Sequence, residues 1–195
     1  FTVVRPSHTY SERKVPVPLH GNHGSFQVVE RIRQGKKVIV PGDGTSLWTL
    51  THSNDFAKGF CGLMGNPHAI GNAYHITSDE RMTWDQIVRT TAQALGVEAR
   101  IVHIPTDVLG RLNHEWVGSM MGDKSNSVWF DNTKIKREAP EFVCTTRFDE
   151  GVREALHTIY ADTSLQKLDP AFDHWCDRVI AQYEAAMETL PAFEG

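Results

Sequence analysis

The amino-acid sequence predicts an α/β fold in which the strands pair in parallel. Short β-rich runs alternate with amphipathic helical segments along the 195 residues, as in βαβ units. Helix boundaries carry capping residues and terminal glycines, most clearly at Thr83-Trp84-Asp85-Gln86 and at Gly96. Apolar residues make up 40% of the chain, which is enough to build a sizeable core.

The first part of the chain is expected to alternate strands and helices up to residue 77. Residues 1–4 form a short strand that stops before Pro6, because proline is unfavourable inside a sheet. Residues 7–24 form a long loop, and loops of this length are usually functional or mobile. A helix follows from its cap at Ser25 to Gly35. The next elements are a strand over 37–40, a turn over 41–44, a short strand over 47–50, a helix over 53–64 with Phe56, Phe60, Leu63 and Met64 at helical spacing, and a strand over 72–77.

The second part of the chain continues this alternation. Thr83 and Gln86 form a capping box, and the helix that they open ends at Gly96. A strand over 100–104 is closed by Pro105. The elements that follow are a helical stretch from Thr106 toward Met121, a strand over 128–130, a helix over 133–138 capped by Asn132, a helix capped by Thr146 with Phe148, Val152, Leu156 and Ile159 on its apolar face, and a last helix that starts at Asp169-Pro170 and reaches Leu190.

Charge and cysteine content argue against several classes of partner. Twenty Lys and Arg against 24 Asp and Glu give a formal net charge of −4, so no nucleic acid or anionic membrane is expected as a partner. No apolar run approaches the roughly 20 residues that span a bilayer. The odd number and wide spacing of the three cysteines, Cys61, Cys144 and Cys176, fit neither a disulfide framework nor a zinc site. Buried thiols in a reducing cytosol are therefore expected, and the predicted location is cytoplasmic.

Residue chemistry alone identifies no complete active site and no metal site. The loop histidines His20 and His23 lie near His8, but their spacing imposes no ligand geometry, so solvated side chains are expected. His52 and Asp55 stand at a helix entrance, where a carboxylate complements the helix dipole. The turn over 41–45 looks like a phosphate loop, but it lacks the lysine and the following helix that a phosphate cradle requires.

Six short blocks carry more information by their order than any one of them does alone. Arg5-Pro6 followed by Tyr10 resembles the end of the sixth sheet strand of one enzyme family, and Val40 to Thr45 with His52 to Ala57 resembles its "GDG … V-D-D-x-A" block. The other matches are Asn72 to Glu80 with Thr83, Gly96 with Pro105, Asp131 to Ile135, and Thr146 to Val152. These blocks cover roughly residues 1–160 and resemble the NAD-dependent epimerase/dehydratase family, the extended short-chain dehydrogenases/reductases.

The resemblance implies a Rossmann domain for NAD or NADP and a smaller C-terminal substrate domain. The family's cofactor glycines and its Tyr-x-x-x-Lys catalytic pair precede the strand with which this chain begins, so no catalytic residue is assigned here. The chain, which starts at Phe1, is expected to be the C-terminal portion, with the last strands of a Rossmann-like parallel sheet and a mixed α/β substrate-binding domain. Residues 1–24 would be the strand end and active-site loop, and residues 25–195 the substrate-binding part with a returning strand near 72–77. The missing Rossmann part is then a partner, and the intact protein could form a homodimer.

The same resemblance points to residues near the reacting end of the substrate. Pro6 and Ser7 follow the strand that lines the nicotinamide end in relatives, so they are expected close to the cofactor. His8 aligns with a frequent Asn that touches the substrate, and an imidazole there could hydrogen-bond the substrate or exchange a proton with it. The alternative for His8 is a loop histidine bonded to backbone.

Departures from the family pattern suggest the substrate class. Relatives that act on nucleotide sugars have an Arg four residues after "GDG", where this chain has Trp48, and often a second Arg before a Gly-Asp pair, where it has Met120 and Met121. Losing those guanidiniums forfeits on the order of 1.5–3 kcal/mol per charged hydrogen bond. His8, Trp48, Met120 and Met121 are therefore predicted to line a site for a small molecule that is not a nucleotide-diphosphate sugar. The alternative is that Arg13, Lys14 or Arg111 supplies the charge.

A rival function is a non-catalytic relative of the same fold that senses NAD(P) or binds RNA. An intact upstream Tyr-x-x-x-Lys pair would favour the enzyme, and its loss would favour the sensor. The acidic balance of the chain argues against RNA.

Overall fold

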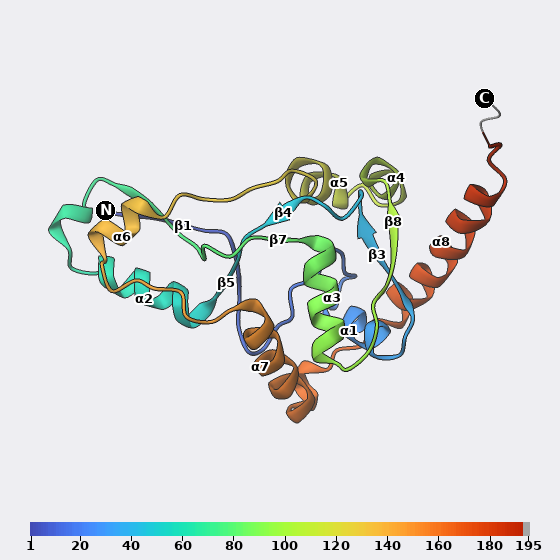
Figure 1. The fold of residues 1–195 in the computed structure, drawn as a ribbon, viewed down its shortest axis with the longest axis horizontal. Helices are drawn as coiled ribbons and strands as arrows, with labels where there is room; N and C mark the ends of the chain where they lie inside the picture. Colours follow the sequence, from blue (N-terminus) through green and yellow to red (C-terminus); the bar gives the residue numbers. More distant parts are fainter. Residues whose placement is uncertain (193–195) are drawn as a thin grey trace.

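The computed structural model describes residues 1–192 and has the predicted α/β architecture with parallel strand pairing (Figure 1). Within these residues the strands form four two-stranded sheets, of which β4–β7 is antiparallel and the other three are parallel. The strands are β1 (Val3–Pro6), β2 (His8–Tyr10), β3 (Lys37–Pro41), β4 (Leu47–Trp48), β5 (Leu50–His52), β6 (Ala73–Ile76), β7 (Met82–Thr83) and β8 (Arg100–Ile104).

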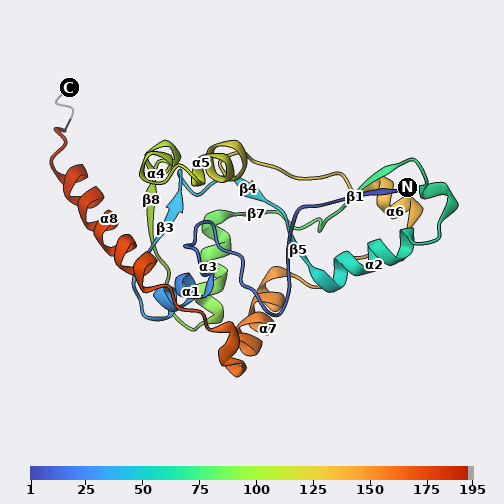
Figure 2. The same cartoon turned by 180° about the vertical axis from the view of Figure 1, so that it is seen from behind.

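Helices cover the sheets and join them into an elongated molecule. The α8 helix begins where Asp169 accepts a hydrogen bond from the Phe172 N–H, as predicted, and its C-terminal half projects from the body (Figures 1 and 2). The helices are α1 (Phe26–Arg33), α2 (Ser53–Leu63), η1 (Pro67–Ala69), α3 (Trp84–Ala94), α4 (Thr106–Leu112), α5 (Trp116–Ser119), the π-helical turn η2 (Met120–Lys124), α6 (Thr133–Glu138), α7 (Phe148–Ala161), η3 (Thr163–Leu165) and α8 (Pro170–Glu188).

The N-terminal segment differs from the prediction in two ways. The first strand runs to Pro6 instead of stopping at Val4, because β1 pairs only with β6 within the described residues and leaves its other edge open to proline. Part of the predicted loop is a strand, since His8–Tyr10 pairs in parallel with β5 in the register His8 to Leu50. Seen from behind in Figure 2, this segment runs from the end occupied by α2 and α6 to the middle of the molecule beside β5.

The middle of that loop, residues 15–19, is packed into the interior. Val15, Val17 and Leu19 alternate along the chain, and each side chain is at most 3% exposed. They insert into the same core as α1, α3, α7 and α8. We expect this loop to hold a defined shape, because moving it would expose three buried aliphatic side chains.

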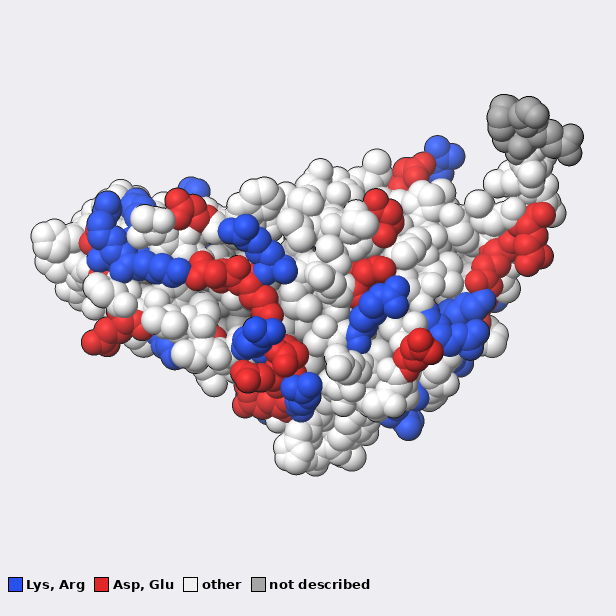
Figure 3. Space-filling model, in the orientation of Figure 1, with Lys and Arg blue, Asp and Glu red and all other residues white. Residues whose placement is uncertain are grey.

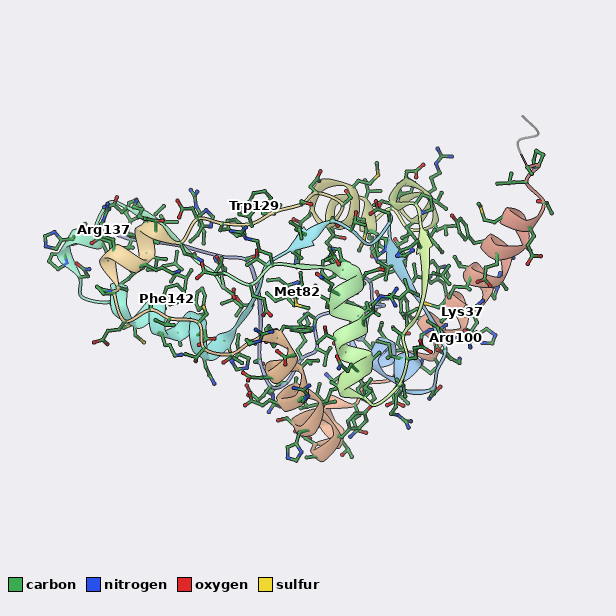
Figure 4. The ribbon with its side chains drawn as sticks, in the orientation of Figure 1. Lys37, Met82, Arg100, Trp129, Arg137 and Phe142 are labelled. Carbon is green, nitrogen blue, oxygen red and sulfur yellow. The ribbon has the colours of Figure 1, made fainter. Side chains whose placement is uncertain are left out.

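Two groups of buried side chains form the interior. The small core cluster lies between the β1–β6 pair, α2 and α6 and consists of Leu63, Ala69, Tyr74, Ile76, Ile135, Ala139 and Phe142. The large core cluster contains the buried faces of α1, β3, α3, α7 and α8 together with Tyr10 and the loop residues. Figure 4 shows the two ends of this arrangement, with Arg137 and Phe142 beside α6 and α2, and Lys37 and Arg100 on the paired strands β3 and β8.

Asp55 joins the start of α2 to the start of α7. Its buried carboxylate accepts hydrogen bonds from the backbone N–H of Thr145 at 3.1 Å and of Thr146 at 2.9 Å, and from Lys58 Nζ at 2.7 Å. Burial opposes ionisation of Asp55, but the bonds from Lys58, Thr146 and Thr145 outweigh it and lower the pKa of the carboxyl group. This carboxylate therefore stabilises the fold, in addition to any helix-dipole contribution.

Three predicted helix caps, Ser25, Asn132 and Thr146, make no side-chain bond to the start of their helix. The cap of α2 is His52, which was not predicted and accepts from the Asn54 N–H. The Asn132 side chain bonds Thr77 and Asp79 instead of the helix that it precedes. Neither Ser25 nor Thr146 caps with its side chain: Ser25 precedes α1 without a side-chain bond, and Arg147 is the residue before α7. In contrast, the capping box of Thr83 and Gln86 is present as predicted.

Several smaller expectations are also corrected. The helical stretch after Thr106 breaks at Asn113, and α8 ends at Glu188 instead of reaching Leu190. Residues 128–130 form no strand, although the Val128 N–H donates to the Leu47 carbonyl at 3.1 Å, and residues 47–52 hold two strands where one was predicted over 47–50. The apolar spacing of α2 buries Leu63 but leaves Phe60 and Met64 exposed, and Cys61 is exposed as well.

None of the helices within residues 1–192 has the length and apolar character needed to cross a membrane.

The substitution Asp55→Asn is expected to lower the free energy of unfolding by about 1.5–3 kcal/mol at neutral pH, because one backbone N–H then faces an amide nitrogen. Since the folded pKa of Asp55 is lowered, its stabilisation is complete above the unfolded pKa of about 3.9 and is lost as the pH falls through the folded value. Urea unfolding at a series of pH values measures both effects. Asp107→Asn is the control, since Asp107 is exposed and lies 3.9 Å from Arg111. Equal effects of the two substitutions would contradict the role given to Asp55.

Candidate functional site

The candidate site lies where β1 passes into β2. The parallel partners β6 and β5 hold the two strands, and the Ser7 hydroxyl between them donates to the Thr49 carbonyl at 3.0 Å. Pro6 is exposed at the carboxyl end of β1, and His8 begins β2. Ligands of open α/β folds bind in the crevice outside the carboxyl ends of parallel strands, so this junction is placed as such a site requires.

Two tryptophans flank His8. Trp48 comes from β4 and Trp84 from the start of α3, and the antiparallel pairing of Trp48 with Met82 brings them together. The indole centroids are 5.2 Å apart, and both side chains are buried. The His8 ring lies edge-on to each, 6.5 Å from Trp48 and 6.4 Å from Trp84 between centroids. Met82 lies next to the start of α3 in Figure 4.

His8 is half-buried in an electropositive environment. The Trp48 indole Nε1–H donates to His8 Nδ1 at 3.1 Å. Burial lowers the pKa of His8 to about 4, and the charges of Lys124, Lys14 and His20 act in the same direction. The imidazole is therefore neutral at physiological pH. Its hydrogen bond is to the Trp48 side chain, and not to backbone as in the alternative of a loop histidine.

Lys124 is the functional candidate that sequence reasoning missed. The η2 turn directs its ammonium to the Pro18 carbonyl at 2.9 Å and places Nζ 5.7 Å from the centroid of the Trp84 ring. Burial lowers the pKa of the Lys124 amine, although Asp123 opposes this shift. The only signal for it in the sequence is its position just after Gly122-Asp123. The family pattern has an arginine before that Gly-Asp pair, so the residue after the pair was not considered.

The structure brings together only part of the predicted site. His8 and Trp48 are in contact, whereas Met120 is 2% exposed in the large core cluster and Met121 is 47% exposed beside Gly110 of α4. Met120 thus belongs to the same buried cluster as the two tryptophans beside His8, whereas Met121 lies largely in solvent. The Ser7 hydroxyl is occupied by Thr49, which leaves Pro6 and the backbone for a neighbouring ligand.

Of the three alternative sources of charge, only Lys14 acts on His8. Arg13 lies 3.9 Å from Asp162, and Arg111 is largely exposed on α4 near Asp107. Lys14 contributes to the lowered pKa of His8 and of Lys124. The positive charge near His8 is thus carried by amines and not by the planar guanidinium fork that binds a phosphate group bidentately.

Tyr10 and Lys14 have the spacing of a Tyr-x-x-x-Lys pair, contrary to the expectation that this spacing is found only upstream. Tyr10 is on β2 and Lys14 is in the loop after it, so the two do not share a helix face. The Tyr10 hydroxyl is buried against Gly151 without a hydrogen-bond partner within residues 1–192. Burial, followed by the charges of Glu80 and Asp55, raises the pKa of Tyr10, which is the opposite of what a catalytic acid/base needs. This tyrosine is part of the core.

The other polar motifs from the sequence have structural roles. His52 is buried as the cap of α2, and Asp55 anchors α7. The turn at Gly42 and Gly44 requires positive φ at both glycines, and a side chain at Gly44 would overlap Asp85. The chain then enters β4 and not a helix, so this turn cannot cradle a phosphate.

The residues at the junction of β1 and β2 fit the edge of a dinucleotide-binding site, but they do not form a complete one. Pro6 is exposed at the carboxyl end of β1, where such a cofactor would pass, and the Ser7 hydroxyl is already bonded. Within residues 1–192 the strand-to-helix glycine turn that binds a pyrophosphate is not found.

Comparisons with known proteins agree with the resemblance drawn from the motifs. The sequence model of the NAD dependent epimerase/dehydratase family matches residues 1–77. A chloroplast stem-loop binding protein of 41 kDa from Arabidopsis thaliana is 29% identical over 104 residues, which is 53% of this chain and 26% of that protein. An uncharacterized UDP-glucose epimerase of Bacillus subtilis is 26% identical over 90 residues, which is 46% of this chain and 28% of that protein.

Solved structures show the same fold. A UDP-glucuronic acid 4-epimerase from Bacillus cereus, solved with UDP-glucuronic acid and NAD, has a TM-score of 0.61 at 17% identity and covers 82% of this chain and 45% of its own. A UDP-glucose 4-epimerase from Thermotoga maritima has a TM-score of 0.62 at 20% identity and covers 82% of this chain and 46% of its own. The chain thus spans less than half the length of each of these relatives. The family model confirms the resemblance to the NAD-dependent epimerases and dehydratases over residues 1–77, and the solved structures confirm the fold.

The substitution Tyr10→Phe is expected to leave stability unchanged or to raise it by about 1 kcal/mol, because it removes a buried hydroxyl that has no partner. Gly151→Ala should cost about 1–3 kcal/mol, since the added methyl group would overlap the Tyr10 hydroxyl. Part of this cost should disappear when both substitutions are combined. Chemical denaturation of the four proteins measures the coupling, and a strictly additive pair would contradict the contact.

Proposed function

We propose that this chain, as a relative of the NAD-dependent epimerases and dehydratases, forms the substrate-binding part of an NAD(P)-dependent epimerase, dehydratase or reductase. The observation that carries the proposal is the placement of Pro6 and His8 at the carboxyl end of a parallel strand, within the segment that matches the family. The catalytic Tyr and Lys of the family, and most contacts to the cofactor, are proposed to lie outside this chain.

In this proposal each residue has a defined task. The bound dinucleotide supplies the site that accepts or returns a hydride. Pro6 borders the nicotinamide end with its exposed ring, and the bond from Ser7 to Thr49 holds the backbone there in place. His8 contacts the substrate, and the buried pair Trp48 and Trp84 forms the wall behind it.

We further propose that the substrate is not anchored through a nucleotide diphosphate. Trp48 and Met120, which take the places of the family's arginines, are buried and committed to packing or to His8. Lys14 and Lys124 supply positive charge near His8 as amines, which suits a single anionic or strongly polarised oxygen. The solved relatives named for UDP sugars point the other way, but at 17% and 20% identity they are evidence for the fold alone.

A second candidate function is RNA binding, because one relative is described as a stem-loop binding protein. Against it stand the net charge of −4 and the interspersed positive and negative side chains on the face shown in Figure 3. Nucleic-acid affinity rests largely on phosphate contacts by clustered Lys and Arg.

Isothermal titration of the 195-residue chain tests the substrate proposal. UDP-glucose, UDP-glucuronic acid and dTDP-glucose are expected to show no micromolar binding, and NAD and NADP no saturable binding tighter than about 1 mM. His8→Ala is the companion variant. Micromolar binding of a nucleotide sugar that His8→Ala weakens would overturn the substrate proposal, and tight binding of NAD or NADP would overturn the placement of the cofactor contacts.

A gel-shift titration with a stem-loop RNA tests the second candidate. No shift is expected at physiological salt. A shift at low micromolar protein that weakens steeply with added salt would favour RNA binding over the enzyme.

A further inference from the structure

The two indoles beside His8 are not equivalent. The Trp48 Nε1–H points to His8 Nδ1 at 3.1 Å, whereas the Trp84 Nε1–H donates to the Lys124 carbonyl at 3.2 Å. Both side chains are buried, and both rings lie edge-on to the imidazole at similar centroid distances. One tryptophan therefore makes a directional bond to His8, and the other only packs against it.

The bond from Trp48 determines which nitrogen of His8 carries the proton. An indole N–H is a donor only, so His8 Nδ1 must offer its lone pair. The neutral ring then has its proton on Nε2. In a doubly protonated ring, the His8 Nδ1–H would face the Trp48 Nε1–H at this distance. The contact with Trp48 therefore also opposes the charged form of His8.

The surroundings of His8 favour the same neutral form. Lys124 from η2, and Lys14 and His20 from the loop after β2, are the charged or titratable groups that act on the ring. Each of them makes a further positive charge on His8 unfavourable. Burial adds to the effect, because a charged imidazole loses hydration in this position.

The remaining nitrogen of His8 is available to a ligand. Nε2 makes no hydrogen bond to any residue between 1 and 192 and is not among the buried polar atoms that lack a partner, so it keeps access to solvent. A neutral Nε2–H that is fixed in direction and free at its outer end can donate one hydrogen bond. It resembles in this respect the amide N–H that an Asn side chain would present.

We propose that Trp48 is a positioning residue that holds His8 as the Nε2–H tautomer, so that His8 donates a hydrogen bond to a carbonyl or carboxylate oxygen of the substrate and does not exchange a proton with it. The nearby amines of Lys124 and Lys14 favour an oxygen that carries negative charge. The donor role toward the substrate rests on the proposed function, but the tautomer does not.

Long-range ¹H–¹⁵N correlation spectra of the chain labelled with ¹⁵N-histidine test the tautomer, with the His8 signals assigned by their loss in His8→Asn. The wild type is expected to show a single Nε2–H tautomer that stays neutral down to about pH 5, where an ordinary imidazole of pKa about 6.5 is mostly charged. Trp48→Phe should give a mixture of tautomers and a His8 that protonates at higher pH. Trp84→Phe is the matched control, since it also removes a buried indole next to His8 and should leave the tautomer unchanged.

Several results would overturn the role of Trp48. These are an Nδ1–H tautomer in the wild type, an unchanged His8 in Trp48→Phe, or the same loss in both tryptophan variants. The signals of the other histidines report whether each variant is folded. If Trp48→Phe does not fold, an Nδ1–H tautomer in the wild type or loss of the Nε2–H tautomer in Trp84→Phe would still overturn the role of Trp48.

Titration with acetate and pyruvate, as simple carboxylate probes, tests the donor role separately. We expect the His8 Nε2–H signal to shift in the wild type, and this response to be lost in Trp48→Phe. An Nε2–H signal that does not respond, with the tautomer intact, would overturn the donor role and count against the proposed function while leaving the action of Trp48 on His8 in place.

Discussion

Two parallel strand pairings made by one short segment determine the placement of the candidate site. Residues 3–6 pair with β6 over the small core cluster, and residues 8–10 pair with β5 and carry Tyr10 into the large core cluster. Ser7 is the link between them and is bonded to Thr49. Tyr10 is buried in the large core cluster, and Val4 packs partly buried against the small one, so a shift of this segment along the chain direction would uncover the core around Tyr10.

Burial then gives the polar groups of this region their properties. Asp55 is ionised because hydrogen bonds from Lys58, Thr145 and Thr146 compensate its loss of hydration, and it ties α2 to α7. His8 is neutral because burial and the neighbouring amines have no carboxylate to offset them. The donors and charges that surround these two groups thus favour the charged form of Asp55 and the neutral form of His8.

Features encoded by a few neighbouring residues were predicted well. The capping box at Thr83, the helix start at Asp169-Pro170 and the apolar face of α7 all depend on residues within one or two turns of each other. The caps at Asn132 and Thr146 were wrong, because the Asn132 side chain is bound by Thr77 and Asp79, far away in the sequence, and α7 begins one residue later than predicted, after Arg147. The three-residue strand β2 was missed, since it is too short to show a period and lies in a stretch rich in polar residues.

The sequence by itself determined the α/β order of elements, the resemblance to the epimerase/dehydratase family and the unusual residues at positions 8 and 48. Only the tertiary structure decided that the Trp48 indole donates to His8 across 40 positions, that Lys124 approaches from η2, and that Met120 belongs to the core. It also decided that Tyr10 and Lys14 are not a catalytic pair. The physical reason is that sequence periodicity reports which face of an element is buried, whereas the direction of a hydrogen bond between distant residues is set by strand register and packing.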